Sequence, residues 1–267
     1  MPKVNDVYNL LKSIAPLEMA VDSDNVGFLV GTGNTDVSKV LVCLDITNDV
    51  VTEALEIGAE VIAAHHPLFF SLSSVTDEDI TGKKIVRMLA GGISAICMHT
   101  NLDAARGGVN DALAVTVGIA DNERIAEPLS DSVRLDCGEI VPLGRVGFLK
   151  KACSVSEYLE VLKKALKADG LRYHDAGTPV YKVAIASGAG GGEWETAKKS
   201  GCDTFVTADI KYHMFLEAKE LGINIIDGGH FCTENVVSDI LVKKLGTEFP
   251  EIEVIISKEL DQTIKFY

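Results

Sequence analysis

The alternation of short apolar runs with longer amphipathic segments is the feature that most constrains how this chain can fold. Residues 40–45, 61–64 and 93–98 are apolar at nearly every position, whereas the segments between them carry apolar residues at helical spacing. Strands that are apolar on both faces are typical of parallel sheets covered by helices. The alternation therefore predicts an α/β fold with mainly parallel or mixed sheets flanked by helices.

The same patterns locate further elements along the chain. Thr47 or Asn48 is expected to cap a helix that Gly58 ends, and Ser154 or Ser156 to cap a later one. Helices are expected over residues 4–14, 48–57, 83–90, 110–117, 154–168, 193–200 and 233–245, with an irregular segment over 71–82. Further strands are expected over residues 133–135, 138–141, 145–149, 183–186, 204–207, 223–226 and 254–256.

The pattern of elements changes in the middle of the chain, where strand-like segments over 132–149 follow one another without helices. This change places a domain boundary near residues 125–130, and 267 residues are enough for two domains. The two halves share the order strand, polar loop, helix, which indicates related domains. We therefore expect one α/β domain, which holds the candidate metal site, from residues 1–126 and 227–267, and a second α/β domain from residues 127–226.

The composition limits the classes of function. The formal net charge is −14, and no basic run is longer than a pair such as Lys83–Lys84, so nucleic-acid binding is disfavoured. No apolar stretch approaches the roughly 18 residues of a membrane span, and the first residues lack the apolar core of a signal peptide. The six cysteines form no C-x-x-C pair, which disfavours a zinc ribbon. We expect a cytoplasmic protein with reduced thiols and no membrane segment.

Candidate metal ligands gather where the expected strands end. In α/β sheets, ligands bind outside the carboxyl ends of the strands. His65 and His66 follow one apolar run, and His99 and Asp103 follow the next. Two alternatives stay open, because an isolated His–His pair is more often solvent-exposed or hydrogen-bonded than metal-bound, and Asp103 can equally stabilise a turn.

A third group follows the strand expected over 223–226 and comprises Asp227, His230 and Glu234. His230 and Glu234 are four residues apart and share one face of a helix turn. Alone, they would be read as a helix start at which Glu234 is stabilised by the helix dipole. Together, three groups that each contain a histidine favour a pair of divalent ions, and Fe, Zn, Mn and Mg all accept such ligands. The expected ligands are His65, His66, Asp103, His230 and Glu234.

Two further groups are candidates for supporting roles. Asp209 and His213 follow the strand over 204–207, and with His99 they are candidates for holding the ligands or transferring protons. The glycine-rich loop over 187–192 can bind phosphate through its backbone N–H groups, but it lacks the P-loop spacing and can equally be a tight turn. Its candidate substrate-binding residues are Gly188, Gly190 and Gly191.

At these motifs the chain resembles the Nif-three-like family, whose bacterial members are known as GTP cyclohydrolase I type 2 homologues. Five separate motifs appear in the family order across nearly the whole chain. The matching segments are Asp24-Asn-Val-Gly-Phe-Leu-Val-Gly31, His65-His-Pro-Leu-Phe-Phe70, His99-Thr-Asn-Leu-Asp-Ala104 with Gly107-Gly-Val-Asn-Asp111, Thr207-Ala-Asp-Ile-Lys-Tyr-His213 and Gly228-Gly-His-Phe-Cys-Thr-Glu234.

The resemblance implies a Nif-three-like fold of two related α/β domains, a toroidal homohexamer, and a dinuclear metal centre that faces the central cavity. By motif position, it implies the same five ligands, with Glu234 bridging the two ions. The chain departs from the family in having Ser23-Asp24-Asn25 where Trp-Asp-Asn is usual. It also lacks the inserted domain of longer members.

Two functions follow from these expectations. The first is a metal-dependent hydrolase that acts on a nucleotide or another phosphorylated metabolite, and the family name points to the opening of the GTP ring. The second is a non-enzymatic ring that binds metal and protein partners in a regulatory or scaffolding role. A DNA-encircling ring fits the net charge of −14 poorly.

Overall fold

The computed structural model describes residues 1–121, 124, 126–129, 133–134, 140–141 and 143–267, which divide into two compact units. Unit 1 consists of Met1–Ala105 and Ser238–Asp261, and unit 2 of Arg106–Val237 and Gln262–Tyr267. The division therefore falls after residues 105 and 237, whereas the sequence led us to expect it after 126 and 226. The first difference arises because the helix that follows residue 105 packs its apolar side chains, such as Leu113, in the core of unit 2.

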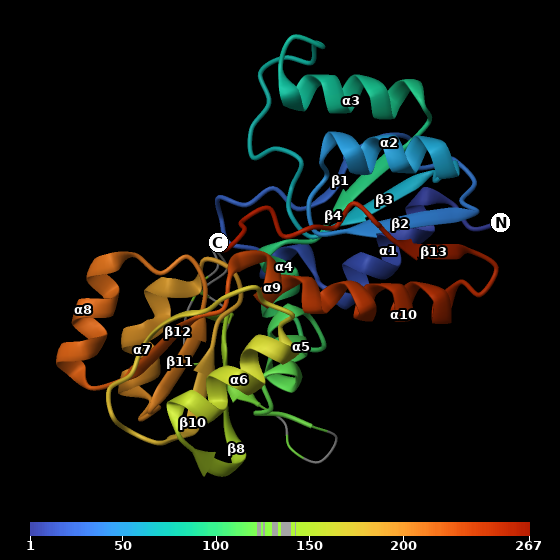
Figure 1. The fold of residues 1–267 in the computed structure, drawn as a ribbon. Coiled ribbons are helices and arrows are strands. Elements are labelled where there is room, and N and C mark those ends of the chain that lie inside the picture. Colours follow the sequence, from blue (N-terminus) through green and yellow to red (C-terminus); the bar gives the residue numbers. More distant parts are fainter. Residues whose placement is uncertain (122–123, 125, 130–132, 135–139, 142) are drawn as a thin grey trace. The chain divides into compact units, whose positions relative to one another are not determined.

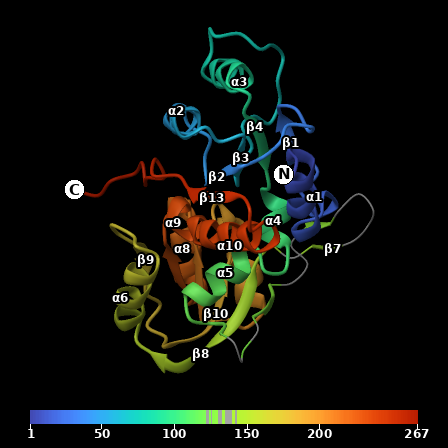
Figure 2. The same ribbon diagram turned by 90° about the vertical axis from the view of Figure 1, so that its right-hand side faces the viewer.

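Unit 1 is built on a five-stranded sheet with the strand order β1-β4-β3-β2-β13. Its strands are β1 (Gly27–Val30), β2 (Lys39–Cys43), β3 (Val61–Ala64), β4 (Ser94–Cys97) and β13 (Glu253–Ile256). All neighbours are parallel except β1, which pairs with β4 in the antiparallel sense. The helices are α1 (Val4–Ile14), α2 (Asn48–Ile57), α3 (Ile80–Ala90), α4 (Thr100–Ala104) and α10 (Ser238–Glu248). Figures 1 and 2 show α2 and α3 on the same side of strands β2, β3 and β4.

Local signals explain the boundaries of the helices in unit 1. The side chain of Thr47 accepts a hydrogen bond from the N–H of Val50 and so caps α2, and Gly58 ends this helix with a left-handed φ of 68°. Both features were expected. Helix α3 begins at Ile80 rather than at residue 83, because the carboxylate of Asp79 caps it by accepting from the N–H of Gly82.

Unit 2 is built on a six-stranded sheet with the strand order β5-β8-β10-β11-β12-β9. Its strands are β5 (Glu127–Pro128), β8 (Arg145–Cys153), β9 (Arg172–His174), β10 (Val180–Ile185), β11 (Thr204–Thr207) and β12 (Asn224–Asp227), and a separate pair comprises β6 (Val133–Arg134) and β7 (Ile140–Val141). The strands β10, β11 and β12 are parallel, and the outer strands are antiparallel to their neighbours. The helices are α5 (Val109–Thr116), α6 (Val155–Ala165), α7 (Trp194–Lys199), α8 (Tyr212–Leu221) and α9 (His230–Glu234).

Side chains alternate between two cores on the faces of this sheet. Val183 and Val206 pack with residues of α5 and α6, whereas Ala184 and Phe205 pack with residues of α7 and α8 (Figure 1). Ser154 caps α6 through a reciprocal pair of hydrogen bonds with Glu157, as one of the two expected caps. Each unit thus carries a mixed sheet flanked by helices, which confirms the predicted fold class.

Three expectations about individual elements need correction or cannot be compared. The helix expected over 233–245 is interrupted, because α9 ends at Glu234 and a 3-10 turn over Asn235–Val237 precedes α10. The strands β1 and β9 were not expected. Residues 135, 138 and 139 of the expected middle strands, and Cys137, lie outside the described residues.

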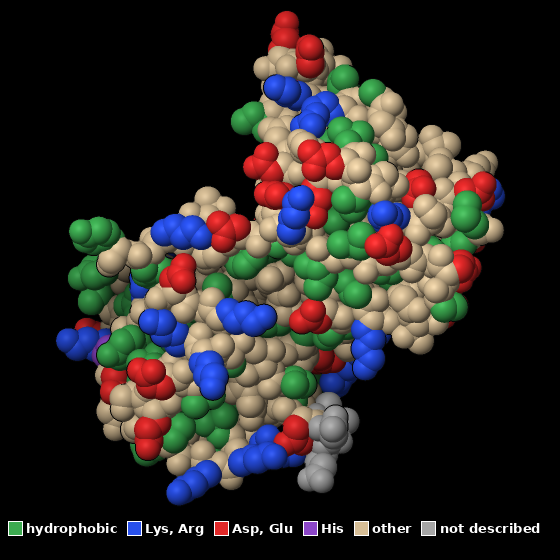
Figure 3. Space-filling view, turned by 45° about the vertical axis from the view of Figure 1, so that its right-hand side comes forward, with side chains coloured by type: hydrophobic (Ala, Val, Ile, Leu, Met, Phe, Trp, Pro, Cys, Tyr) green, Lys and Arg blue, Asp and Glu red, His purple; other side chains and the backbone are tan. Residues whose placement is uncertain are grey.

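The surface and the helices bear on two further expectations. On the face shown in Figure 3, Lys and Arg side chains are interspersed with Asp and Glu rather than gathered into a continuous basic surface. No helix in the described part of the chain combines the length and the apolar character that a membrane crossing requires. The five cysteines among the described residues, Cys43, Cys97, Cys153, Cys202 and Cys232, are free thiols.

Candidate metal centre

Three histidine rings of unit 1 lie side by side at the ends of two neighbouring strands. His65 and His66 directly follow β3, and His99 lies two residues after β4, which is parallel to β3. The ring centroids are 5.0 Å apart for His65 and His66, 5.2 Å for His65 and His99, and 5.4 Å for His66 and His99. One nitrogen of each ring lies within 4.8 Å of the others, so this histidine cluster can hold a metal ion.

Each ring of the histidine cluster is anchored through its Nδ1 atom. The Nδ1–H of His65 donates to the carbonyl oxygen of Met98 at 2.8 Å. The same atoms of His66 and His99 donate to the carboxylates of Asp45 at 2.7 Å and Asp24 at 2.9 Å. A hydrogen bond at one ring nitrogen selects the tautomer in which the other nitrogen carries the lone pair. The anchors therefore make Nε2 the nitrogen that can coordinate an ion.

Asp24 is the most deeply buried of these carboxylate anchors, with a side chain that is only 1% exposed. It also accepts hydrogen bonds from the backbone N–H and the hydroxyl of Thr100. Burial alone would raise the pKa of Asp24, but the hydrogen bonds from His99 and Thr100 outweigh it and lower the pKa to about 2. Asp24 is thus an ionised anchor, even though the tryptophan usual before it in the family is Ser23 here.

Asp103 adds a carboxylate to the histidine cluster. It lies in the short helix α4 and is buried, and its Oδ1 is 3.7 Å from Nε2 of His65. This approach to His65 is compatible with a role as a ligand, and the choice between this role and the stabilisation of a turn stays a prediction. Unit 1 therefore brings together His65, His66, Asp103 and His99.

In unit 2, His230 and Glu234 occupy the first and last positions of α9 and contact each other directly. Nε2 of His230 lies 3.0 Å from Oε2 of Glu234, and its Nδ1 donates to the carboxylate of Asp209 at 2.8 Å. The hydrogen bond to Glu234 raises the pKa of His230, burial opposes this effect, and the charges of Glu234 and Asp209 reinforce it. The resulting pKa is about 9, so the metal-free ring carries a proton on each nitrogen.

Because Gly188 has no side chain, His230 and Glu234 can occupy the space beside it. Gly188 has a left-handed φ of 55°, and a Cβ atom at this position would lie 1.9 Å from Oε1 of Glu234 and 3.2 Å from Nε2 of His230. Its N–H donates to the hydroxyl of Thr233, and its carbonyl accepts from the N–H of Ala208. These contacts indicate a packing role for Gly188, since its N–H is already used.

Three other candidate residues are Gly190 and Gly191 in the glycine-rich loop and His213 after β11. A Cβ atom on Gly190 would lie 2.4 Å from that of Ala186, whereas one on Gly191 would meet no atom closer than 3.4 Å. Phosphate binding by this loop stays a prediction. His213 is exposed in the first turn of α8, and its side chain makes no hydrogen bond with any described residue, so its role in proton transfer also stays a prediction.

Sequence reasoning missed the anchoring roles of three groups. Asp24 stands inside one of the family motifs, but the histidine partners of Asp24 and Asp45 were not identified. The carbonyl of Met98 gives no signal in the sequence, because every residue has one. The residues that hold a metal-binding ring are thus harder to predict than the ring itself.

The types of donor atom in these side chains suit a divalent ion. Imidazole nitrogens with carboxylate oxygens are ligands that Zn, Fe and Mn accept, and carbonyl or carboxylate anchors behind the imidazoles are typical of metal sites. The protein thus has a two-unit α/β fold in which His, Asp and Glu side chains beyond the strand ends can bind a metal ion.

The chain belongs to the Duf34/NIF3 (NGG1p interacting factor 3) family, whose model matches residues 2–262. A Clostridium perfringens protein named GTP cyclohydrolase 1 type 2 homolog is 36% identical over 267 residues, which cover 99% of each chain. A protein of the same name from Clostridium acetobutylicum is 33% identical and covers 97% of this chain and 90% of its own. The crystal structure of a Bacillus cereus protein related to NIF3 matches with a TM-score of 0.90 at 25% identity, covering 100% of this chain and 99% of that one. These findings confirm the family resemblance that the motifs indicated.

Proposed function

We propose that this protein is a metal-dependent hydrolase that binds two divalent ions, drawn from Fe, Zn, Mn and Mg. The proposed ligands are His65, His66 and Asp103 from unit 1 with His230 and Glu234 from unit 2, and Glu234 is proposed to bridge the ions. The anchoring of Nδ1 on His65, His66 and His230 by an oxygen atom carries this proposal. Histidines that serve only as surface residues have no need of such anchors.

The side chains around the ligands have separable roles in this proposal. A bound divalent ion would lower the pKa of a water molecule and polarise an oxygen of the substrate. Asp45 and Asp209 hold the rings of His66 and His230 in the orientation that coordination needs. His99 accepts a proton at Nε2, while Asp24 at Nδ1 stabilises the imidazolium that forms.

The proposed substrate is a nucleotide or another phosphorylated metabolite, with GTP as the first compound to assay. The names of the curated relatives from two Clostridium species support GTP. No motif of this chain reads a guanine base, so phosphoesters and other nucleotides belong in the same panel. A cytoplasmic location stays a prediction of the sequence.

We also propose that the chain assembles as a homohexamer, as the resemblance of its motifs implies, and native mass spectrometry tests this assembly. The alternative function, a non-enzymatic ring that binds metal and protein partners, shares the metal ligands and the assembly. It differs in turnover alone, so the assay of activity separates the two functions.

The test begins with metal analysis of the purified protein, followed by assays of GTP and phosphoesters after reconstitution with Mn²⁺, Fe²⁺ or Zn²⁺. We expect turnover that a chelator abolishes and that is lost in Glu234→Ala. Glu220→Ala, which removes an exposed carboxylate from α8, serves as the matched control. Metal removal should also lower the Tm, because an ion bound only by the folded state stabilises it. Metal binding without turnover of any compound would support the alternative function instead.

A further inference from the structure

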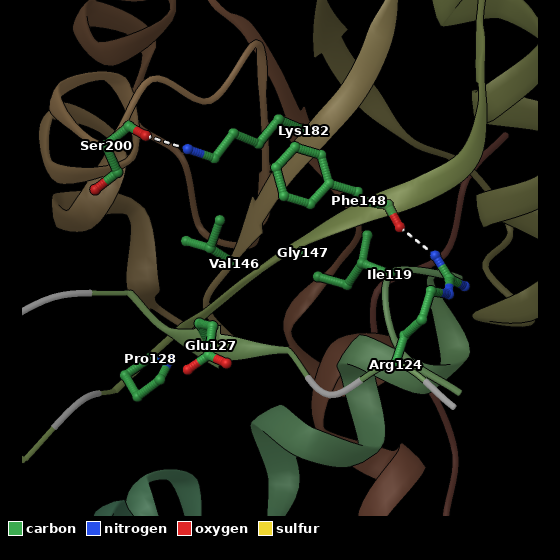
Figure 4. Close-up of a pocket in the computed structure, with 9 residues that line it drawn as sticks. All are labelled: Ile119, Arg124, Glu127, Pro128, Val146, Gly147, Phe148, Lys182 and Ser200. Carbon is green, nitrogen blue, oxygen red and sulfur yellow. Dashed lines mark hydrogen bonds between the residues drawn. The ribbon is translucent and has the colours of Figure 1, made fainter. Parts of the chain in front are cut away.

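A pocket of about 640 Å³ in unit 2 lies apart from the candidate metal ligands. Figure 4 shows Glu127 and Pro128 along one side of it and Lys182 with Ser200 along the other. Lys182 is the third residue of β10 and pairs with Phe148 of β8. Asp209 and His230, by contrast, follow the carboxyl ends of β11 and β12, which run parallel to β10. Lys182 therefore lies toward the end of the unit 2 sheet that is opposite to these residues.

The walls of the pocket are mostly apolar, and an aromatic ring forms part of them. The side chain of Phe148 is 47% exposed, and its ring lies 5.3 Å from that of Tyr181. A Cβ atom on Gly147 would lie 2.5 Å from the carbonyl oxygen of Ile119, so only a glycine allows the backbones of residues 147 and 119 to lie this close. Ile119 and Val146 complete the apolar wall beside the ring (Figure 4).

Lys182 supplies a positive charge that forms no ion pair with a carboxylate of any described residue. Its Nζ donates to the carbonyl oxygen of Ser200 at 2.5 Å, which uses one of its three N–H groups. In the described part of the chain, no carboxylate lies within 4.0 Å of this Nζ. Arg124 differs, because its guanidinium pairs with Asp121 at 2.9 Å and donates to the carbonyl oxygen of Phe148. An anion in the pocket would therefore find its partner at Lys182.

We propose that this pocket binds a small planar aromatic molecule that carries one carboxylate. The ring packs against Phe148, and the carboxylate accepts hydrogen bonds from the ammonium group of Lys182, whose Nζ lies 5.8 Å from the Phe148 centroid. Glu127 on the opposite side disfavours a second anionic group on the ligand. A volume of about 640 Å³ falls within the roughly 300–1,000 Å³ of small-molecule sites.

The test compares 2-naphthoate with its neutral amide by isothermal titration calorimetry, on the full chain and in the presence of EDTA. EDTA removes metal ions, so that the carboxylate cannot bind to the proposed metal centre. We expect saturable binding of one 2-naphthoate per chain, about tenfold tighter than the amide, because a hydrogen bond to a charged group is worth that much.

Three variants assign the binding to the pocket. Lys182→Met should abolish the preference for the acid, and Phe148→Ala should weaken both compounds. Lys151→Met is the matched control, since it removes an exposed lysine from β8, the strand of Phe148, and should keep the preference. The proposal is overturned if binding is not saturable, if it disappears with EDTA, or if Lys182→Met retains the preference. Binding that strengthens on dilution would show that a second copy of the chain covers the pocket, and this would overturn the proposal too.

Discussion

The candidate ligands of unit 1 and unit 2 differ in how the chain holds them. In unit 1, His65 and His66 follow a strand, and their Nδ1 atoms are anchored to oxygens of Met98 and Asp45. In unit 2, Oε2 of Glu234 lies 3.0 Å from Nε2 of His230, the nitrogen that would coordinate an ion. Oxygen atoms anchor Nδ1 in both units, and in unit 2 the carboxylate of Glu234 also lies within 3.0 Å of Nε2 of His230. A metal ion must therefore compete with a proton in unit 2.

The strongest test of this difference is Glu234→Gln, which keeps the shape of the side chain and removes its charge. We expect the affinity for Zn²⁺ or Mn²⁺ to fall roughly 100-fold, at the upper end of the loss seen when groups around a metal are removed. In the metal-free variant, the pKa of His230 should fall from about 9 toward 6.5, because Glu234 is the main cause of its elevation. Calorimetry and NMR titration of the imidazole measure the two effects.

The sign of the pH dependence provides a second measurement on the same variant. A pKa that is raised on folding stabilises the folded state fully below pH 6.5 and loses this effect as the pH rises through about 9. Without metal, the parent protein should have a larger free energy of unfolding than Glu234→Gln at pH 6.5. This difference should shrink as the pH rises from 6.5 to about 9. A His230 that still titrates near 9 in the variant would contradict the assigned cause.

The next largest effect is expected for Gly188→Ala, which places a methyl group where Glu234 lies. The variant should lose about 1 kcal/mol of stability because of its left-handed φ, and more than tenfold in metal affinity because Glu234 must move. Gly222→Ala is the matched control, since Gly222 has a φ of 65° with nothing within 4 Å of an added Cβ atom. Equal metal affinities in the two variants would show that Gly188 does not position Glu234.

Asp24→Asn probes the buried anchor of unit 1. The folded-state pKa of about 2 against the ordinary 3.8 means that ionised Asp24 stabilises the fold above pH 3.8 and loses this effect as the pH falls through 2. The difference corresponds to roughly 2 kcal/mol. Urea unfolding should show this loss in the variant at pH 5.5 and a smaller one at pH 2.5. Asp22→Asn, at an exposed position nearby, should show neither.

The smallest effect is expected for Asp45→Asn, which keeps a hydrogen-bond acceptor for His66 but removes the charge. We expect the metal affinity to fall about tenfold, the lower end for groups that support a ligand. The exposed Asp49 on α2 offers a control of the same kind, Asp49→Asn. An unchanged affinity in Asp45→Asn would mean that the charge of Asp45 contributes nothing to metal binding.

The local pattern of the sequence determined much of the fold. Strands β3 and β11 lie where apolar runs predicted them, and α1 and α2 have the predicted bounds. These elements are readable because burial on both faces, helical spacing and capping residues act over a few neighbouring positions. The strand β9 lacked such a signal, because its residues Arg172–His174 are mostly exposed at the edge of the sheet.

The sequence by itself also determined which side chains follow the strand ends, including His65, His99 and His230. Only the tertiary structure decided what holds each ring: Asp24 reaches His99 across 75 positions of the chain, and Asp45 reaches His66 across 21. It likewise decided that Gly188 must leave room for Glu234. The physical reason is that these contacts depend on strand order and on packing between distant segments, which no local pattern encodes.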